Sequence, residues 1–120
     1  MYGLSADFDT SIFVGKMLEC VVFGINIIHF RFDDELSISL ESSFKHRMSR
    51  DQKEREVIQV PVSDSHLMRL TGKVVVSAKV ECPGTLTLEF EDGQVLSCIE
   101  DSSLYESYQI TYGEKWVIVV

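Results

Sequence analysis

The sequence lacks the features that identify several large classes of protein. It contains no apolar run of about 18 residues, the length that spans a bilayer as a helix, and no basic-then-apolar leader for export. Its three cysteines are an odd number at irregular spacings, so we expect reduced thiols in the core rather than a disulfide framework. These absences favour a cytoplasmic protein with a single domain over residues 1–120.

Positive charge is scarce. The formal net charge is −8 at pH 7, which argues against nucleic-acid binding because a phosphate backbone attracts a basic surface. A negative surface instead keeps a protein soluble and draws it toward basic partners.

Motifs for metal binding are also missing. None of the three histidines is spaced with another histidine or a cysteine as a metal-ligand pair. Asp33-Asp34, Asp92 and Glu100-Asp101 are acidic groups that could gather a divalent cation, but hairpin turns explain them more simply. We therefore predict no bound metal and no cofactor.

What the sequence does contain is an internal repeat. Residues 14–44 and 71–108 run in parallel, with Gly15-Lys16 answering Gly72-Lys73 and Phe32-Asp33-Asp34 answering Phe90-Glu91-Asp92. A repeat of this length sets the architecture of the whole chain. It predicts two pseudo-repeats, at about residues 6–62 and 63–120.

Strand periodicity is clearest in the second copy. Thr85 to Glu91 alternates strictly, which places its leucines and its phenylalanine on one face and polar side chains on the other. The matching segment of the first copy is Ile25 to Phe32. Asp92-Gly93 then provides a tight hairpin turn, whereas Asp34-Glu35 in the first copy requires a turn of another type or length.

A short helix precedes each glycine-lysine pair. In the second copy Ser63-Asp64-Ser65 offers capping side chains, and Leu67, Met68 and Leu70 form an apolar stripe. The segment that begins at Asp9-Thr10 follows the same plan. Each copy is then a short helix followed by about four antiparallel strands.

These elements predict a fold that is mainly β. Two copies that are each too small to bury a sheet face should pack face to face or share one sheet. We expect internally duplicated antiparallel sheets that form a pseudo-symmetric sandwich or open barrel with short helices.

Two segments leave alternatives open. Val74, Val76, Ala78 and Val80 alternate cleanly, but the equivalent alternation in the first copy would point Glu19 into the core, so we expect an edge or a bulge there rather than a slipped register. The last strand, Trp116 to Val120, is either paired inside a sheet or exposed at an edge that dimerises.

Catalytic signatures are weak. Cys98 and His66 could meet in space, but the position of Cys98 holds Leu40 in the other copy, which indicates a core position. No G-x-S-x-G elbow and no phosphate-binding glycine cluster is present. We predict that the protein is not an enzyme.

The most distinctive stretch is EDSSLYESYQI, from Glu100 to Ile110. Tyrosines with neighbouring acids and serines are typical of interfaces, because each tyrosine offers a large apolar ring and one hydroxyl. The candidate partner-binding residues are Asp101, Ser102, Tyr105, Glu106 and Tyr108. The alternative is that Tyr108 and Ile110 face inward and Tyr105 covers a sheet edge.

At this point the second half resembles a known family. Its pattern F-E-D-G-x-x-L, then D-S-x-x-Y-E-S-Y-x-I and a terminal apolar strand, is similar to that of a family of small bacterial proteins of unknown function. The resemblance covers Leu70 to Val120 well and the first half loosely, and it implies a bacterial, cytosolic, stand-alone domain. In size, charge and β content the chain is also similar to bacterial immunity proteins, which neutralise toxins.

The leading functional hypothesis is a non-enzymatic binding protein, in its most concrete form an acidic immunity-type inhibitor of a basic toxin domain. The first alternative is an assembly module that homodimerises through an edge strand. The second alternative is a small-molecule sensor or enzyme with a pocket lined by polar groups.

Overall fold

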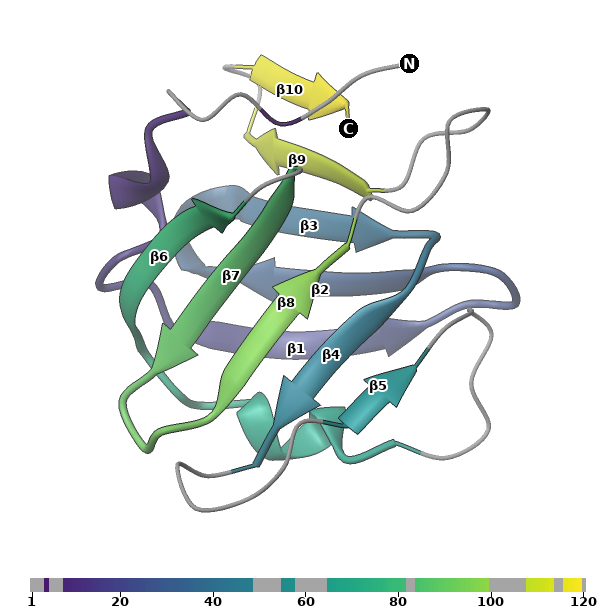
Figure 1. The fold of residues 1–120 in the computed structure, drawn as a ribbon. Coiled ribbons are helices and arrows are strands. Elements are labelled where there is room, and N and C mark those ends of the chain that lie inside the picture. Colours follow the sequence, from purple (N-terminus) through teal and green to yellow (C-terminus); the bar gives the residue numbers. More distant parts are fainter. Residues whose placement is uncertain are drawn as a thin grey trace.

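The fold of the chain is seen in a computed structural model, which describes residues 4, 8–48, 55–57, 65–81, 84–99, 108–113 and 116–119 (Figure 1). These residues form ten β-strands and three short 3-10 helices, and no α-helix occurs among them. The expectation of a mainly β fold is confirmed. Over the same residues, no helix has the length and apolar character needed to cross a membrane.

The strands form two open antiparallel sheets of five strands each (Figure 1). The first sheet, in spatial order, is β1 (Leu18–Phe23), β2 (Ile28–Phe32), β3 (Leu36–Leu40), β9 (Tyr108–Tyr112) and β10 (Trp116–Val119). The second sheet is β5 (Arg55–Val57), β4 (Phe44–Arg47), β8 (Val95–Cys98), β7 (Thr85–Phe90) and β6 (Val75–Glu81).

This order shows that the two copies exchange strands. The first copy supplies β1 to β3 to the first sheet and β4 to β5 to the second, while the second copy supplies β6 to β8 to the second sheet and β9 to β10 to the first. The duplication is therefore visible in the topology, but the expected number of about four strands per copy is wrong. Among the described residues each copy has five strands, and its last two complete the sheet of the other copy.

Buried polar contacts hold the crossing chain after β3. The Ser42 hydroxyl donates to the Ile99 carbonyl oxygen at 2.6 Å, and the Ile99 amide donates to the Ser43 carbonyl oxygen at 3.2 Å. Because Ile99 directly follows β8, these bonds direct β4 to the edge of β8 rather than back along β3.

The two copies meet at the glycine-lysine pairs that reveal the repeat. Met17 and Val74 form an antiparallel bridge. Four backbone hydrogen bonds surround it in two equivalent pairs: Gly15 N to Val75 O and Gly72 N to Leu18 O, both 2.8 Å, and Leu18 N to Lys73 O and Val75 N to Lys16 O, both 2.9 Å. Gly15 and Gly72 have φ of +87° and +82°, a region that strains other residues. This contact marks a local two-fold pseudo-symmetry.

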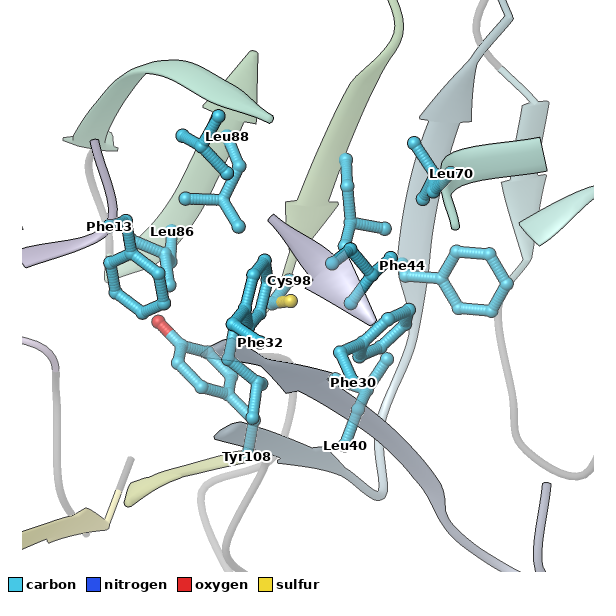
Figure 2. Close-up of a cluster of buried hydrophobic side chains, with 14 of the residues drawn as sticks. Phe13, Phe30, Phe32, Leu40, Phe44, Leu70, Leu86, Leu88, Cys98 and Tyr108 are labelled. Atoms are coloured by element: carbon cyan, nitrogen blue, oxygen red, sulfur yellow. The ribbon is translucent and has the colours of Figure 1, made fainter. Parts of the chain in front are cut away.

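One hydrophobic core lies between the sheets and draws on both copies (Figure 2). Phe32 and Phe90 are both buried, and they stand opposite Leu18 and Val75, which are themselves equivalent. The ring of Phe13 packs edge-to-face on Phe32, with 5.7 Å between the ring centroids. Equivalent residues of the repeat thus have equivalent environments.

The same bulge interrupts β1 and β6. The register shifts between Leu18 and Cys20 in the first sheet and between Val75 and Ser77 in the second. Glu19 lies at the first bulge, on an edge strand, and is exposed, so the expectation of an edge or a bulge is confirmed. The clean alternation expected around Val76 is wrong, because the bulge turns Val75 inward and leaves Val76 49% exposed.

The short helices precede the glycine-lysine pairs as expected. η1 (Thr10–Ile12) is capped by Asp9, whose Oδ1 accepts from the Ser11 amide at 3.1 Å. η3 (Leu67–Leu70) starts after His66 without a side-chain cap, and Met68 is exposed, so the predicted stripe is wrong at this residue. At three residues per turn Leu67 and Leu70 align and Met68 faces away. Ser63 and Asp64 lie outside the described residues.

The two hairpin turns differ as the sequence predicts. Gly93 has φ of +90° in the turn between β7 and β8. In the first copy, η2 (Asp33–Glu35) replaces that turn, and Asp34 and Glu35 adopt φ of +58° and +62°. Two residues other than glycine therefore occupy left-handed backbone conformations.

Among the described strands, the last one lies at an edge of the first sheet and not inside it, as the second of the two alternatives requires. β10 pairs antiparallel with β9 and ends the first sheet on that side of the described strands. Pairing through its other edge stays a prediction.

Candidate functional site

Tyr108 is a core residue, so its predicted place at a partner-binding surface is wrong. Its ring is buried between the sheets (Figure 2). Its hydroxyl donates to the Gly84 carbonyl oxygen at 2.7 Å. The reason is the register of β9: it lies beside β3, and Tyr108 stands opposite Leu40, which is buried. Ile110 is buried as well, which confirms the inward-facing alternative for these two residues.

The other four candidates, Asp101, Ser102, Tyr105 and Glu106, lie outside the residues that the structure describes. Their role in partner binding stays a prediction.

Cys98 is buried in the core, as its equivalence with Leu40 indicates (Figure 2). Burial without a compensating charge raises the pKa of its thiol to about 12. The thiolate is the reactive form of cysteine, so this side chain is unsuited to nucleophilic catalysis at neutral pH.

The acidic turn residues neutralise the lysines that follow the repeated glycines. Asp34 lies 3.6 Å from the Lys16 ammonium, and the equivalent Asp92 lies 4.0 Å from Lys73. Among the described residues, no group of three or more His, Cys, Asp or Glu side chains could hold a metal ion. The turn interpretation of Asp34 and Asp92 is confirmed.

The candidate site is a polar hollow of about 270 Å³ on the outer face of the second sheet. It lies over β6, β7, β8 and β4, which face the viewer in Figure 1. Its lining is Arg47, Ser77, Lys79, Glu81, Thr87, Glu89, Val95 and Ser97.

Strand register arranges this face in rows that cross four strands. The first row is Lys45, Ser97, Thr87 and Lys79, and the second row is Arg47, Val95, Glu89 and Ser77. Neighbouring strands lie about 4.8 Å apart, so each row brings side chains from both copies within reach of one another. Without the exchange of β4, neither Lys45 nor Arg47 would be on this sheet.

Small hydroxyl side chains form the floor of the hollow. Thr87 and Ser97 are only 7% and 6% exposed although they belong to the outer face, because longer charged side chains surround them. The Thr87 hydroxyl donates to Glu81 Oε1 at 2.6 Å. Its single hydrogen is then used, so in its 3.3 Å contact with Ser97 the serine is the donor.

The charged groups at the rim are unequally satisfied. Glu81 accepts from Thr87 and lies 3.8 Å from the Lys79 ammonium, and Glu89 Oε1 accepts from the Ser77 hydroxyl at 3.3 Å. Among the described residues, Arg47 Nε is a buried side-chain polar atom without a hydrogen-bond partner. A buried donor without an acceptor costs about 1–3 kcal/mol, more for a charged group.

The first sheet carries a different chemistry at the equivalent positions. His29 Nδ1 lies 2.8 Å from Ser39 Oγ, where the second sheet has Thr87 and Ser97. Arg31 occupies the place of Glu89. The two outer faces share a scaffold but present different charges.

A second, more open hollow of about 590 Å³ lies near the turn after β7. Beneath it, Gln94 Oε1 lies 2.9 Å from His46 Nε2, and Gln94 Nε2 donates to the Arg69 carbonyl oxygen at 2.9 Å and to Asp92 at 2.8 Å. These polar groups satisfy one another, so the cluster ties β4, η3 and the turn together.

The tip of the β1–β2 hairpin is apolar and exposed. Phe23 is 48% exposed and Ile25 is 84% exposed. The Gly24 amide donates to the Ile27 carbonyl oxygen at 2.7 Å, and a Cβ at Gly24 would lie 2.8 Å from Ile27 Cγ2. Glycine therefore permits a tight tip that holds Phe23 and Ile25 in solvent.

Sequence reasoning found part of this surface. The alternation of Thr85 to Glu91 places Thr87 and Glu89 on the outer face of the sheet, as observed, although Thr87 is only 7% exposed. It missed Arg47 and Ser97 as their neighbours, because nothing in the periodicity of β4 says which sheet it joins. Leu40 in β3 and Cys98 in β8 are equivalent positions of the repeat, so the sequence allows β4 to pair with either of these two strands.

Comparison with known proteins identifies a family. No curated protein and no solved structure matches the chain. The model of the family described as "Family of unknown function (DUF6188)" matches residues 10–120, which include both copies of the repeat. The chain therefore belongs to the family of unknown function DUF6188.

Proposed function

We propose that this chain is a non-enzymatic binding protein that recognises a protein partner. The observation that carries the proposal is the exposed apolar tip formed by Phe23 and Ile25. Both residues lie at one hairpin turn, and neither belongs to the buried core.

The energetics of the tip suit an anchor. Burial of one large apolar side chain in a partner contributes about 1.5–3 kcal/mol, and an aromatic ring beside it is typical of interface hot spots. The turn closed by Gly24 and Ile27 is already formed in the free chain, so little ordering entropy is lost on binding.

The charge of the chain selects the kind of partner. At −8 the protein attracts basic surfaces over a long range and accelerates their association. The most specific form of this proposal is a cytoplasmic immunity-type inhibitor of a basic toxin domain. In that form Asp101, Ser102, Tyr105 and Glu106 would add polar contacts to the apolar anchor.

The test is the affinity of the chain for the purified protein encoded by the neighbouring reading frame. Ile25→Ser should weaken binding about tenfold or more, since it removes the anchor, and the complex should weaken as salt is raised. Val14→Ser is the matched control, because Val14 is also an exposed apolar residue but lies outside the tip. Equal affinities for the two variants, a salt-independent affinity, or no complex would contradict the proposal.

A second candidate is assembly through β10, which ends the first sheet among the described strands. An unpaired strand edge is a template for pairing with another chain. Light scattering tests it: a dimer of the 13.6 kDa chain that persists on dilution favours assembly, and a monomer excludes it.

A further inference from the structure

We propose that the second hollow, which lies beside η3 and the turn after β7, is a binding site for a small amphipathic carboxylate. In this site Arg69 and Lys73 bind the ligand's carboxylate, and Met48 and Met68 contact its apolar chain. The inference does not depend on the protein-binding function proposed above, because the hairpin tip does not line this hollow.

The hollow is of the size that small ligands require. Its volume of about 590 Å³ falls within the usual range of about 300–1,000 Å³ for ligand pockets. Three parts of the chain meet there: the residue after β4, η3 with the residues that follow it, and the turn between β7 and β8 (Figure 1).

Met68 is an exposed residue whose position the core does not explain. It is 71% exposed, whereas Leu67 and Leu70 of the same short helix are fully buried. A methionine side chain is flexible and polarisable, so it adapts to apolar ligands of different shapes. Met48 lines the same hollow from the end of β4. The two methionines therefore offer an apolar surface to the ligand's chain.

The repeat provides an internal comparison for Lys73. The equivalent Lys16 ammonium lies 3.6 Å from Asp34 and 5.9 Å from the centre of the Tyr112 ring, and the Lys16 side chain is only 16% exposed. Lys73 lies 4.0 Å from Asp92, and its side chain is 40% exposed. The lysine of the first copy is thus packed against its partners, whereas that of the second copy is more open to a further anion.

Arg69 makes the hollow positive. It is exposed, and among the described residues its guanidinium takes part in no ion pair. The lining contains two cations, Arg69 and Lys73, and one carboxylate, Asp92, so its formal charge is +1. One carboxylate neutralises this charge, whereas a dianion would add negative charge to a chain that already carries −8. The guanidinium fork also fits a carboxylate through two parallel hydrogen bonds.

Hydrogen bonds within the chain hold the walls of the hollow in place. Gln94 Nε2 donates to the Arg69 carbonyl oxygen at 2.9 Å and to Asp92 at 2.8 Å, which ties η3 to the turn. The Thr71 hydroxyl donates to the Met68 carbonyl oxygen at 2.7 Å. Because these polar groups are already paired, the two cations are the charged groups that a ligand can use. Little of the wall has to become ordered on binding.

The experiment is a nuclear magnetic resonance titration of the intact chain with octanoate. We expect a Kd below about 1 mM and shifts of the methyl signals of Met48 and Met68. Met17 is the internal control, since it is 40% exposed but lies outside the hollow, and its methyl signal should not move. Acetate keeps the carboxylate without the chain, and octanamide keeps the chain without the charge. Each should bind at least about tenfold more weakly than octanoate.

Two variants connect the affinity to the site. Arg69→Gln and Met68→Ser should each weaken octanoate binding, about tenfold or more for Arg69→Gln, which removes a charged contact. Arg31→Gln is the matched control, because Arg31 is also exposed but lies on the outer face of the other sheet, and it should leave the affinity unchanged. Circular dichroism of all three variants confirms that they are folded.

Three results would overturn the proposal. The first is a Kd for octanoate above about 1 mM. The second is octanamide that binds as tightly as octanoate, which would mean an apolar surface without a carboxylate site. The third is an affinity for octanoate that Arg69→Gln does not change.

Discussion

At the scale of single residues, the two copies of the repeat place different residue types in the same backbone conformation. Gly93 and Glu35 follow equivalent aspartates in equivalent turns, and both have positive φ. Glycine adopts this conformation freely, whereas an L-residue pays about 1–2 kcal/mol for it. The first copy therefore carries backbone strain that the second copy lacks.

Replacement of Glu35 by glycine should relieve that strain. We expect Glu35→Gly to raise the free energy of unfolding by about 1 kcal/mol, measured by urea denaturation. The matched control is Arg31→Gly, which places glycine in the middle of β2. This variant should lower the free energy of unfolding by about 0.5–1 kcal/mol. Destabilisation by both variants would show that the turn is not strained as described.

Cys98 predicts how stability responds to alkaline pH. Its pKa is raised by burial to about 12 in the folded chain, while the unfolded thiol titrates near its ordinary value of 9.0. Between these values the unfolded state loses a proton that the folded state keeps. Stability from this group is therefore complete below pH 9 and falls above it, by up to about 1.4 kcal/mol per pH unit.

Comparison with Cys98→Ala isolates this effect from the other groups that titrate at high pH. The variant is less stable at neutral pH because it leaves a small cavity, but the gap to the wild type should narrow as the pH rises above 9. Parallel pH profiles would contradict the assigned burial of the thiol.

At the scale of elements, the paired bulges change which face of a strand reaches the core. Val75 is buried and Val76 is 49% exposed, and Glu19 occupies the position equivalent to Val76. The two copies are therefore more alike in structure than in the periodicity of their sequences.

The bulge in β6 is tested by replacing Val76, in the second copy, with glutamate, the residue type at the equivalent position 19 of the first copy. Val76→Glu should change the free energy of unfolding by less than about 0.5 kcal/mol, because the side chain points to solvent. Val75→Glu should cost several times more, or abolish folding, because it buries an unpaired charge. If Val76→Glu were the more damaging variant, the register would be the one that simple alternation predicts.

Much of this level of structure can be predicted from the sequence. The repeated Gly-Lys pairs mark where the copies touch, Asp92-Gly93 marks a hairpin, and strict alternation identifies β7. The bulge at Val76 cannot be recognised in the sequence, because Val74, Val75 and Val76 are identical and either face of the strand could carry an apolar side chain there. Only the charge of Glu19, in the other copy, indicates that the position faces outward.

The membership of β4 and β9 in their sheets cannot be predicted in the same way. Leu40 and Cys98 are equivalent, so Phe44 could stand opposite either residue with the same register and the same burial. The repeat itself creates this ambiguity. Only contacts far apart in sequence, such as Ser42 with Ile99, settle it.

The candidate site could not be predicted in full for the same reason, because it depends on which sheet β4 joins. Thr87 and Glu89 are recognisable as solvent-facing residues of β7, but the hollow requires Arg47 from the other copy. For Tyr108, interface and core are equally compatible with its amphipathic side chain. Its register opposite the buried Leu40 places it in the core.

At the scale of the whole molecule, the strand exchange is the feature on which the rest depends. It joins the copies into one core, and it brings Arg47 to the face where Glu89 and Ser97 lie. Neither copy can complete a five-stranded sheet alone, so the fold and the polar hollow on the outer face of the second sheet arise together.

The most direct test of this exchange is a map of nuclear Overhauser contacts between backbone protons in solution. The account predicts cross-strand contacts between Phe44 and Cys98 and between Leu40 and Tyr108, in the registers of β4 with β8 and β3 with β9. Contacts between Phe44 and Leu40 and between Tyr108 and Cys98 would mean that each copy pairs with itself, and would contradict it.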